Sequence, residues 1–217
     1  MRKLHGVALS PYVRKVRIAL EEKGLEYENE PVLPMNFSDD FLKLSPLGKI
    51  PVYEEDGWTV PDSSIICDYL DRTVPQPALY PTDPRERAEA AFLEEWSDTA
   101  LVSQGVGPVF FNRVVKPTFL KEEADQAAID QALNEDLPKL QDYLESRLAD
   151  GRTFFVSNAF TIADIAIAAA YVSLAHTGEA PDSTKWPKLA AWLQAMHSRP
   201  TFAKVIAEER AMLGLTD

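Results

Sequence analysis

Ser10 and Pro11 stand where the sequence predicts the start of a helix. Serine is a preferred helix cap and proline suits the first helical position, and Val13, Val16 and Leu20 follow at helical spacing. A hydroxyl at this place can donate a hydrogen bond to an anion, and the helix N-terminus adds partial positive charge. The same spacing also fits a serine that only caps the helix. The motif alone therefore leaves an anion site and a simple cap open.

Asp62 and Ser63 open a second predicted helix, which carries Ile65, Ile66 and Tyr69. The free backbone N–H groups of its first turn, together with the Ser63 hydroxyl, could bind a carboxylate. Either residue would also cap the helix without a ligand. Capping and ligand binding are compatible here, so this helix start is a second candidate anion site.

The chain lacks the usual signatures of a metal centre or a disulfide. Cys67 is the only cysteine, which excludes an intrachain disulfide, a cysteine-rich metal site and a CxxC redox pair. We expect it to be a small packed residue on its helix. The three histidines, His5, His176 and His197, are scattered without metal-ligand spacing. We therefore predict no bound metal.

Net charge narrows the range of partners. The 217 residues hold 22 Lys and Arg against 34 Asp and Glu, a formal charge of −12. This balance argues against a general binder of nucleic acid or anionic membranes. The first 20 residues nevertheless carry five basic side chains and no acid, including Arg14 and Arg17 just after Ser10. We interpret this local excess as positive potential near the first helix start.

Targeting segments are not evident. The apolar stretch near the N-terminus is too short and interrupted for a signal peptide, and the longest purely apolar run, residues 165–172, is far below the length that spans a bilayer. We expect a cytoplasmic protein without membrane contact.

The first 76 residues predict a small α/β domain of order βαβαββα. Asp56-Gly57 between two β-type runs is a hairpin signature. The expected elements are a strand at 3–9, a helix from 10 to 24, a strand at 27–32, a helical turn at 41–44, strands at 50–54 and 58–60, and a helix from 62 onward.

A proline-rich stretch separates this domain from an all-helical part. Residues 74–84 carry four prolines, and we predict a linker at 77–86 and a helical domain over 87–217. A helix is expected from residue 85 to about 101, and a long apolar stripe from Ile129 to Leu148 predicts another helix, kinked near Pro138. Thr161 and Asp164 predict a capping box ahead of a nearly all-apolar central helix.

In this order the motifs resemble the cytosolic glutathione S-transferase superfamily, in its serine-type classes. Singly they are weak, but together they cover almost the whole chain. They are SPYVRKV at 10–16, SPLGKIPV at 45–52, DSSIICDYL at 62–70, FTIADI at 160–165, and a closing helix with Trp186, Pro187, Leu189, Trp192, Met196, Arg199 and Pro200. The resemblance implies a thioredoxin-like N-terminal domain joined to an all-helical C-terminal domain.

The resemblance implies that Ser10 stabilises the thiolate of glutathione. A thiol with a pKa near 8.5 is mostly protonated at neutral pH, so it needs a hydrogen-bond donor and positive potential to become a nucleophile. Tyr12 is the alternative donor, because another branch of the superfamily uses tyrosine. That tyrosine is expected nearer the end of the first strand, where this sequence has Val7 and Ala8.

The other glutathione contacts follow from the same resemblance. The Ile50-Pro51 bond is expected to be cis and to present backbone groups to the cysteinyl part of the peptide. Lys49 could reach the glycyl carboxylate, Ser63 would bind the γ-glutamyl carboxylate, and Asp62 the ammonium group. Many relatives have glutamate at the Asp62 position, so the shorter aspartate leaves the ammonium contact to a water or a small shift.

The electrophile pocket is assigned to Tyr12, Phe110, Phe111 and Arg113. In the family the segment 106–113 faces the sulfur, although an aromatic pair at this spacing is also typical of a core. The sequence thus predicts a homodimeric glutathione transferase of detoxification type, with glutathione as co-substrate, acting on small hydrophobic electrophiles. A glutathione-dependent peroxidase or isomerase, and a non-catalytic glutathione-binding carrier or interaction protein, remain alternatives.

Overall fold

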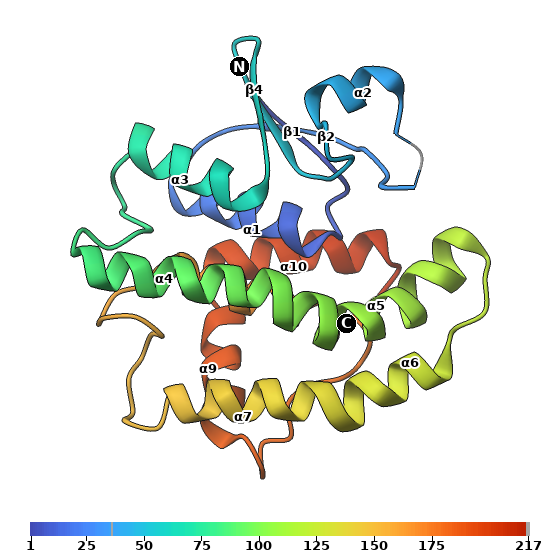
Figure 1. Ribbon diagram of the computed structural model, residues 1–217, viewed down its shortest axis with the longest axis vertical. Helices are drawn as coiled ribbons and strands as arrows, with labels where there is room; N and C mark the ends of the chain where they lie inside the picture. Colours follow the sequence, from blue (N-terminus) through green and yellow to red (C-terminus); the bar gives the residue numbers. More distant parts are fainter. Residues whose placement is uncertain (36, 216–217) are drawn as a thin grey trace.

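A computed structural model describes residues 1–35 and 37–215, with a sheet domain resting on a helical domain (Figure 1). The sheet domain begins β1-α1-β2-α2-β3-β4-α3, which confirms the predicted βαβαββα order. Its elements are β1 (Arg2–His5), α1 (Pro11–Glu22), β2 (Glu28–Glu30), α2 (Asp39–Leu44), β3 (Val52–Glu55), β4 (Trp58–Pro61) and α3 (Ser63–Thr73).

The sheet is mixed, with strand order β2-β1-β3-β4. β1 pairs in parallel with β2 and antiparallel with β3, and β3 pairs with β4 through the predicted hairpin. Asp56 and Gly57 both adopt positive φ, as the two central residues of a tight hairpin turn require.

The first strand is shorter than predicted. β1 ends at His5, not at Leu9, because the chain turns at Gly6, which has a φ of 153°. A Cβ on Gly6 would lie 2.5 Å from a Val13 methyl carbon, so only glycine fits this close approach. The apolar residues Val7 and Leu9 then line a pocket instead of extending the strand. Similarly, β2 covers only three residues of the predicted 27–32.

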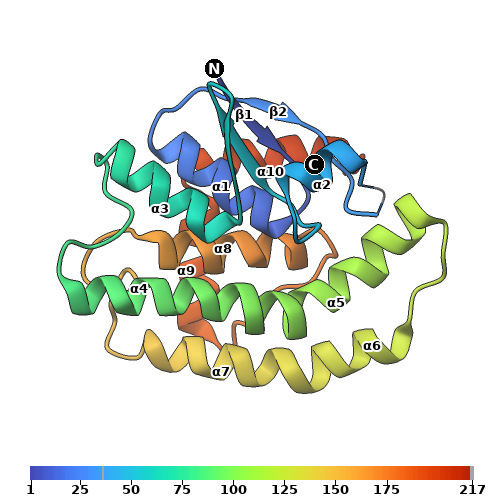
Figure 2. The same cartoon turned by 45° about the horizontal axis from the view of Figure 1, so that its top comes forward.

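The helical domain stacks in layers below the sheet domain (Figure 2). The central helix α8 lies between the sheet domain and the helices that start with α4. The elements of the helical domain are α4 (Pro84–Trp96), η1 (Ser97–Val106), α5 (Gly107–Phe110), η2 (Phe111–Leu120), α6 (Gln126–Gln131), η3 (Ala132–Asp136), α7 (Leu137–Arg147), α8 (Ile162–Ala175), α9 (Pro187–His197) and α10 (Pro200–Met212).

The η segments are π-helical, a winding that the sequence analysis did not predict. The helix expected to end near Leu101 continues through η1, α5 and η2 to Leu120. Pro138 is the second residue of α7, which follows the π-helical segment η3 directly, so the change of winding lies where the kink was expected. π-Helical turns frequently occur at functional sites, and η1 and η2 both contribute pocket residues here.

The segment between α3 and α4 is firmly packed. Leu79 and Tyr80 are buried within it. The Leu79 N–H donates to Asp71 at 2.8 Å, and the Leu79 carbonyl accepts from the Ile162 N–H at 2.8 Å. This proline-rich stretch therefore ties the sheet domain to the start of α8. α4 begins at Pro84, inside the range predicted for the linker.

The predicted capping box at the start of α8 is confirmed. The Asp164 carboxylate accepts hydrogen bonds from the Thr161 N–H at 2.9 Å, the Thr161 hydroxyl at 3.1 Å and the Phe155 N–H at 3.0 Å. α8 is buried from Ile162 to Leu174, as an all-apolar helix requires. Asp164 is therefore a folding element at the centre of the molecule.

Burial raises the pKa of the Asp164 carboxyl to about 6, although its hydrogen bonds favour the ionised form. A folded-state pKa above the unfolded value means that the native state binds the proton more tightly between about pH 4 and 6. We expect the wild type to lose roughly 2 kcal/mol between pH 4 and 7 relative to Asp164→Asn, which has no titrating group at this position. Urea unfolding of both proteins across this range measures the difference. If the difference in unfolding free energy between the two proteins does not change with pH, the raised pKa of Asp164 is contradicted.

Candidate functional site

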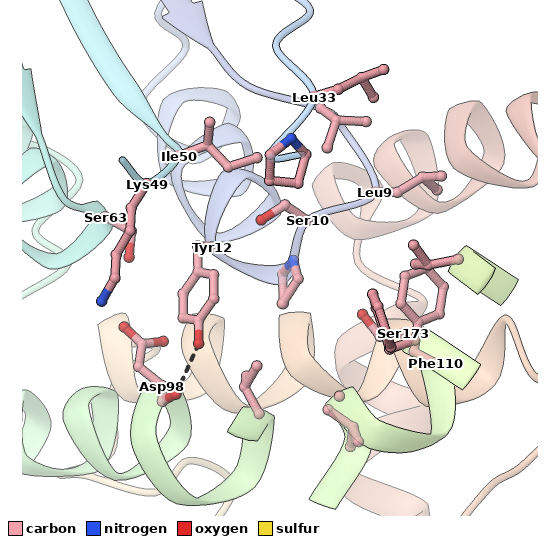
Figure 3. A pocket seen from close by; sticks show the side chains of 18 of the residues that line it. Leu9, Ser10, Tyr12, Leu33, Lys49, Ile50, Ser63, Asp98, Phe110 and Ser173 are labelled. Carbon is pink, nitrogen blue, oxygen red and sulfur yellow. Dashed lines mark hydrogen bonds between the residues drawn. The ribbon is translucent and has the colours of Figure 1, made fainter. Parts of the chain in front are cut away.

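A pocket of about 620 Å³ lies between the sheet domain and the helical domain. Most of the residues predicted for the site line it, from segments far apart in the sequence (Figure 3). They are Ser10, Tyr12, Lys49, Ile50, Asp62, Ser63, Phe110 and Phe111. The polar side chains of Lys49, Ser63 and Asp98 lie on one side of Ser10 in Figure 3, and Phe110 lies on the other.

Ser10 is the N-cap of α1, with an extended backbone. Its Oγ accepts only a long hydrogen bond, 3.5 Å, from the Val13 N–H. A cap this weak leaves the hydroxyl able to turn and donate to a ligand atom in the pocket. Pro11 has no N–H, so the Tyr12 N–H is the first backbone donor of the helix.

Tyr12 lines the same pocket, but its hydroxyl is already engaged. It donates to the Asp98 backbone carbonyl at 3.1 Å. Burial, together with the Asp98 carboxylate, raises the pKa of Tyr12, so the phenol stays protonated. Tyr12 is therefore placed to shape the pocket wall, whereas the Ser10 proton is the one left available for an anion.

The Ile50-Pro51 bond is cis, as the resemblance implied. Ile50 and Lys49 line the pocket, with Lys49 exposed, while Pro51 is buried behind them and its carbonyl accepts from the Asp62 N–H at 3.3 Å. The hydrogen bond between Asp62 and Pro51 joins the end of the Lys49–Pro51 segment to the start of α3.

Asp62 is the N-cap of α3 and accepts from the N–H groups of Ser64 and Ile65, at 3.0 and 3.3 Å. Its φ of 80° lies in a region that residues other than glycine rarely adopt and that recurs at functional sites. Ser63 is buried and lines the pocket. The predicted second anion site is thus built as a helix start that faces the cavity.

A cluster of buried charged side chains beside this helix start was not predicted from the sequence. The Lys15 ammonium lies 2.6 Å from Asp98 and 3.0 Å from Glu94, and it donates to the Ser64 hydroxyl at 3.1 Å. Ser64 in turn donates to Glu95 at 3.1 Å and Asp98 at 3.4 Å.

The acids of this cluster are coupled to the lysine. Burial opposes the Lys15 charge, but Glu94 and Asp98 outweigh it and raise the pKa of Lys15, while burial raises the pKa of Asp98. Glu95 and Asp98 line the same pocket as Asp62, so three carboxylates contribute to its lining. No local motif marks Asp98, because it comes from a distant helix.

Arg113, like Pro51, is a predicted site residue that does not line the pocket. It does not line the pocket but forms an ion pair with Glu179 at 2.6 Å. Phe111, Val115 and Phe119, which follow one another at intervals of four residues, line the cavity, and Arg113 lies on another side of that segment. Its assignment to the electrophile pocket stays a prediction that the pocket lining does not support.

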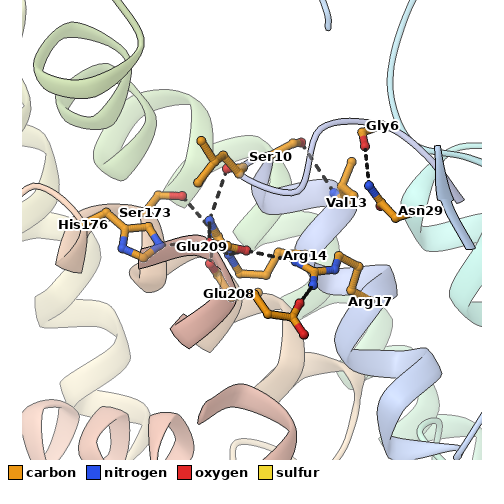
Figure 4. A network of polar contacts seen from close by, with 12 residues as sticks. Gly6, Ser10, Val13, Arg14, Arg17, Asn29, Ser173, His176, Glu208 and Glu209 are labelled. Atoms are coloured by element: carbon orange, nitrogen blue, oxygen red, sulfur yellow. Dashed lines mark hydrogen bonds and ion pairs between the residues drawn. The ribbon is translucent and has the colours of Figure 1, made fainter. Parts of the chain in front are cut away.

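The positive potential predicted from Arg14 and Arg17 also needs correction. Arg14 is 0% exposed, and its guanidinium donates to the Glu209 carboxylate at 2.6 Å. Arg17 is paired with Glu208 and lies 3.6 Å from Glu209 (Figure 4). Acids of α10 neutralise both side chains, so these two arginines join the sheet domain to the helical domain.

Cys67 is buried inside α3, and burial raises the pKa of its thiol well above the usual value. It is therefore inert as a thiolate. Within the described ranges, no group of three His, Cys, Asp or Glu side chains could hold a metal ion. Within the same ranges, no helix is long and apolar enough to cross a membrane.

Comparisons with known proteins match both domains. The family described as "Glutathione S-transferase, N-terminal domain" matches residues 4–78, and "Glutathione S-transferase, C-terminal domain" matches residues 107–200. A glutathione S-transferase of Hyoscyamus muticus is 32% identical in an alignment of 217 positions that covers 94% of this chain and 97% of the relative.

Other relatives carry different names on the same fold. FtsZ-localized protein A of Caulobacter vibrioides is 29% identical and covers 95% of this chain and 91% of its own length. The crystal structure of a glutathione S-transferase from Rhodospirillum rubrum F11 superposes with a TM-score of 0.86 at 30% identity, over 94% of this chain and 91% of that one. The thioredoxin-like domain and the helical domain are thus confirmed, and the chain belongs to the glutathione S-transferase superfamily.

Proposed function

We propose that this protein is a glutathione transferase that conjugates glutathione to small hydrophobic electrophiles, with Ser10 stabilising the thiolate. The single observation that carries the proposal is the pocket itself. It combines a polar side, able to bind a zwitterionic peptide, with an apolar side, and Ser10 lies between them (Figure 3).

The polar side suits the charges of glutathione. The start of α3, with Ser63, suits the γ-glutamyl carboxylate, and Asp62 and Asp98 suit the neighbouring ammonium group. Lys49 suits the glycyl carboxylate, and the backbone at Ile50 suits the cysteinyl part. The short side chain of Asp62 then matters less, because Asp98 supplies a second carboxylate on the same side of the pocket.

The apolar side suits the electrophile. Phe110 and Phe111, with Val106 and Phe119 beside them, give a wall on which an apolar molecule can pack. In the reaction, the thiol proton leaves to solvent and the sulfur electron pair forms a bond to the electrophilic carbon. The leaving group departs with the electron pair of its own bond. Ser10 stabilises the thiolate throughout and makes no covalent bond.

We also propose that the protein is a cytoplasmic homodimer with a detoxification role and that it needs no metal. Exposed apolar side chains on neighbouring elements support a self-association surface: Trp58 of β4, Ile65 of α3 and Phe92 of α4.

Glutathione binding and turnover test the proposal together. We expect retention on immobilised glutathione and conjugation of a dinitro-substituted aryl chloride, followed by absorbance. Asp62→Asn, which keeps the shape but removes the charge facing the ammonium group, is expected to raise the KM for glutathione about tenfold with a smaller effect on kcat. Asp40→Asn, at an exposed position outside the pocket, serves as the matched control.

The alternatives give different outcomes in the same experiment. Binding without turnover of any electrophile would favour a non-catalytic glutathione-binding carrier or interaction protein, and one relative is named for its localisation with FtsZ. Turnover confined to hydroperoxides or to isomerisable double bonds would favour the peroxidase or isomerase. Absence of binding at millimolar glutathione would contradict all of these proposals.

A further inference from the structure

The helical run from α4 to η2 bends in the wall of the pocket. In Figures 1 and 2 its direction changes between α4 and α5, where Gly107 and Pro108 follow each other. Pro108 offers no N–H to the preceding turn. A Cβ on Gly107 would clash with the Val102 carbonyl oxygen, so this close approach requires glycine. Proline and glycine are common causes of helix kinks, and kinks of this kind can act as hinges.

The segment beyond this kink, residues 110–125, is here called the arm. It contains the last residue of α5, η2 and the loop before α6. Val109, just before the arm, belongs to the main core, whereas Phe110 and Val114 of the arm belong to a separate small apolar cluster. In the described part of the chain, η2 packs extensively only on α5 and α6, its neighbours in sequence. Few contacts therefore hold the arm to the body of the protein.

An ion pair holds the arm from a side that does not line the pocket. The Arg113 guanidinium lies 2.6 Å from the Glu179 carboxylate, in the loop that follows α8. The two side chains are 32% and 36% exposed. Because an exposed ion pair contributes little to stability, it can break at a small cost in free energy. The pair is thus suited to act as a latch.

Large apolar side chains of two separate segments line the pocket and yet remain exposed. Phe111 and Phe119 of the arm are 42% and 43% exposed, and Leu33, between β2 and α2, is 50% exposed. Leu33 and Phe110 lie on different sides of the cavity in Figure 3. Exposed apolar side chains gathered at one opening mark a surface that becomes covered. In the observed position of the arm, this opening is uncovered.

We propose that the arm closes over the pocket, towards Leu33, when a glutathione conjugate with an apolar group is bound, and that the Arg113–Glu179 pair holds it open in the free protein. The inference rests on the proposed transferase function, because the ligand is the product of that reaction. A ligand shifts such an equilibrium only if it binds one state better than the other. The apolar group contacts both walls only in the closed state, and closure also buries the exposed side chains. Rotation about Gly107 and Pro108 supplies the movement.

A fluorescent label on one wall and a tryptophan on the other test the closure. Because Cys67 is buried, a bimane label reacts with the new cysteine of Leu33→Cys, and Phe119→Trp supplies a side chain that quenches bimane on contact. We expect S-hexylglutathione to lower the fluorescence of this protein at least about twofold, and glutathione, which has no apolar group, to lower it less. The labelled protein with Phe119 unchanged gives the effect of the ligand alone.

Two further substitutions in the labelled protein test the latch and the hinge. Arg113→Met breaks the ion pair and should raise the ratio of closed to open protein about two- to fivefold without ligand. Lys204→Met, which breaks an exposed ion pair with Glu21 at 2.7 Å, is the matched control and should not change this ratio. Pro108→Ala restores an N–H to the helix and should reduce the response to S-hexylglutathione at least about threefold.

The outcomes separate the closure from the proposed function. If calorimetry shows that S-hexylglutathione binds while the bimane fluorescence does not change, the closure is overturned and the transferase stands. Equal ratios in Arg113→Met and Lys204→Met would overturn the latch, and an undiminished response in Pro108→Ala would overturn the hinge. If S-hexylglutathione does not bind, the proposed function is overturned, and the closure with it.

Discussion

Replacement of Ser10 by alanine is expected to raise the pKa of the bound glutathione thiol by about one to two pH units and to lower kcat/KM about 10- to 100-fold at neutral pH. A hydrogen bond to a full negative charge contributes about 1.5–3 kcal/mol, and one pKa unit corresponds to about 1.4 kcal/mol. Among residues 1–35 and 37–215, the hydroxyl has only the long cap contact with the Val13 N–H. The thiolate absorbance of the binary complex, titrated against pH, measures the pKa directly.

Two further variants separate the donor from its surroundings. Ser10→Thr keeps a hydroxyl at a helix cap and should retain most of the thiol pKa shift and of the rate. Tyr12→Phe removes the alternative donor, whose proton is held by the Asp98 carbonyl in the structure. If Tyr12→Phe raises the thiol pKa and Ser10→Ala does not, the roles of the two residues must be exchanged. An unchanged pKa and rate in Ser10→Ala would contradict the assignment.

Local patterns in the sequence predicted the elements that carry the site. The hairpin at Asp56-Gly57, the helix starts at Ser10 and Asp62, and the capping box at Thr161 each depend on residues within a few positions of one another. Such short-range rules act wherever the segment lies in the fold. For this reason the elements could be predicted from the residues alone, whereas the glutathione contacts were implied by the family resemblance.

Interactions between distant segments could not be predicted in the same way. Asp98 meets Lys15 across 83 positions, and Glu209 meets Arg14 across 195. In the sequence these residues are only charged positions within amphipathic helices, and charged side chains at such positions are usually solvated. The π-helical winding of η1 and η2 was not predicted from the sequence either. The excess of basic residues in the first 20 positions can be counted from the sequence, but the acidic side chains that pair with them cannot be identified there.

Arg14→Met is expected to destabilise the protein by about 3–5 kcal/mol, the largest effect among the substitutions considered. It leaves the Glu209 carboxylate buried without its main partner, and uncompensated buried charge is costly. Burial alone would raise the pKa of Glu209, but Arg14 and His176 outweigh it and lower that pKa, so the carboxylate is ionised in the folded protein. Urea unfolding at pH 7 measures the loss. Lys43→Met is the matched control, since the exposed Lys43–Asp40 pair should contribute less than about 1 kcal/mol.

The double variant Arg14→Met/Glu209→Leu distinguishes a structural charge from a catalytic one. It removes both buried charges, so most of the lost stability should return. If Arg14 also acted on the thiolate through its charge, the pKa of the bound glutathione thiol would rise in the folded double variant. We expect it to stay within about 0.3 pH units of the wild type, because Glu209 already neutralises the guanidinium in the folded protein. A rise of a full unit would restore the interpretation that the basic N-terminal stretch activates the ligand. The expected result would instead leave Ser10 and the helix start as the groups that favour the thiolate, and Arg14 as a residue that ties the sheet domain to α8 and α10.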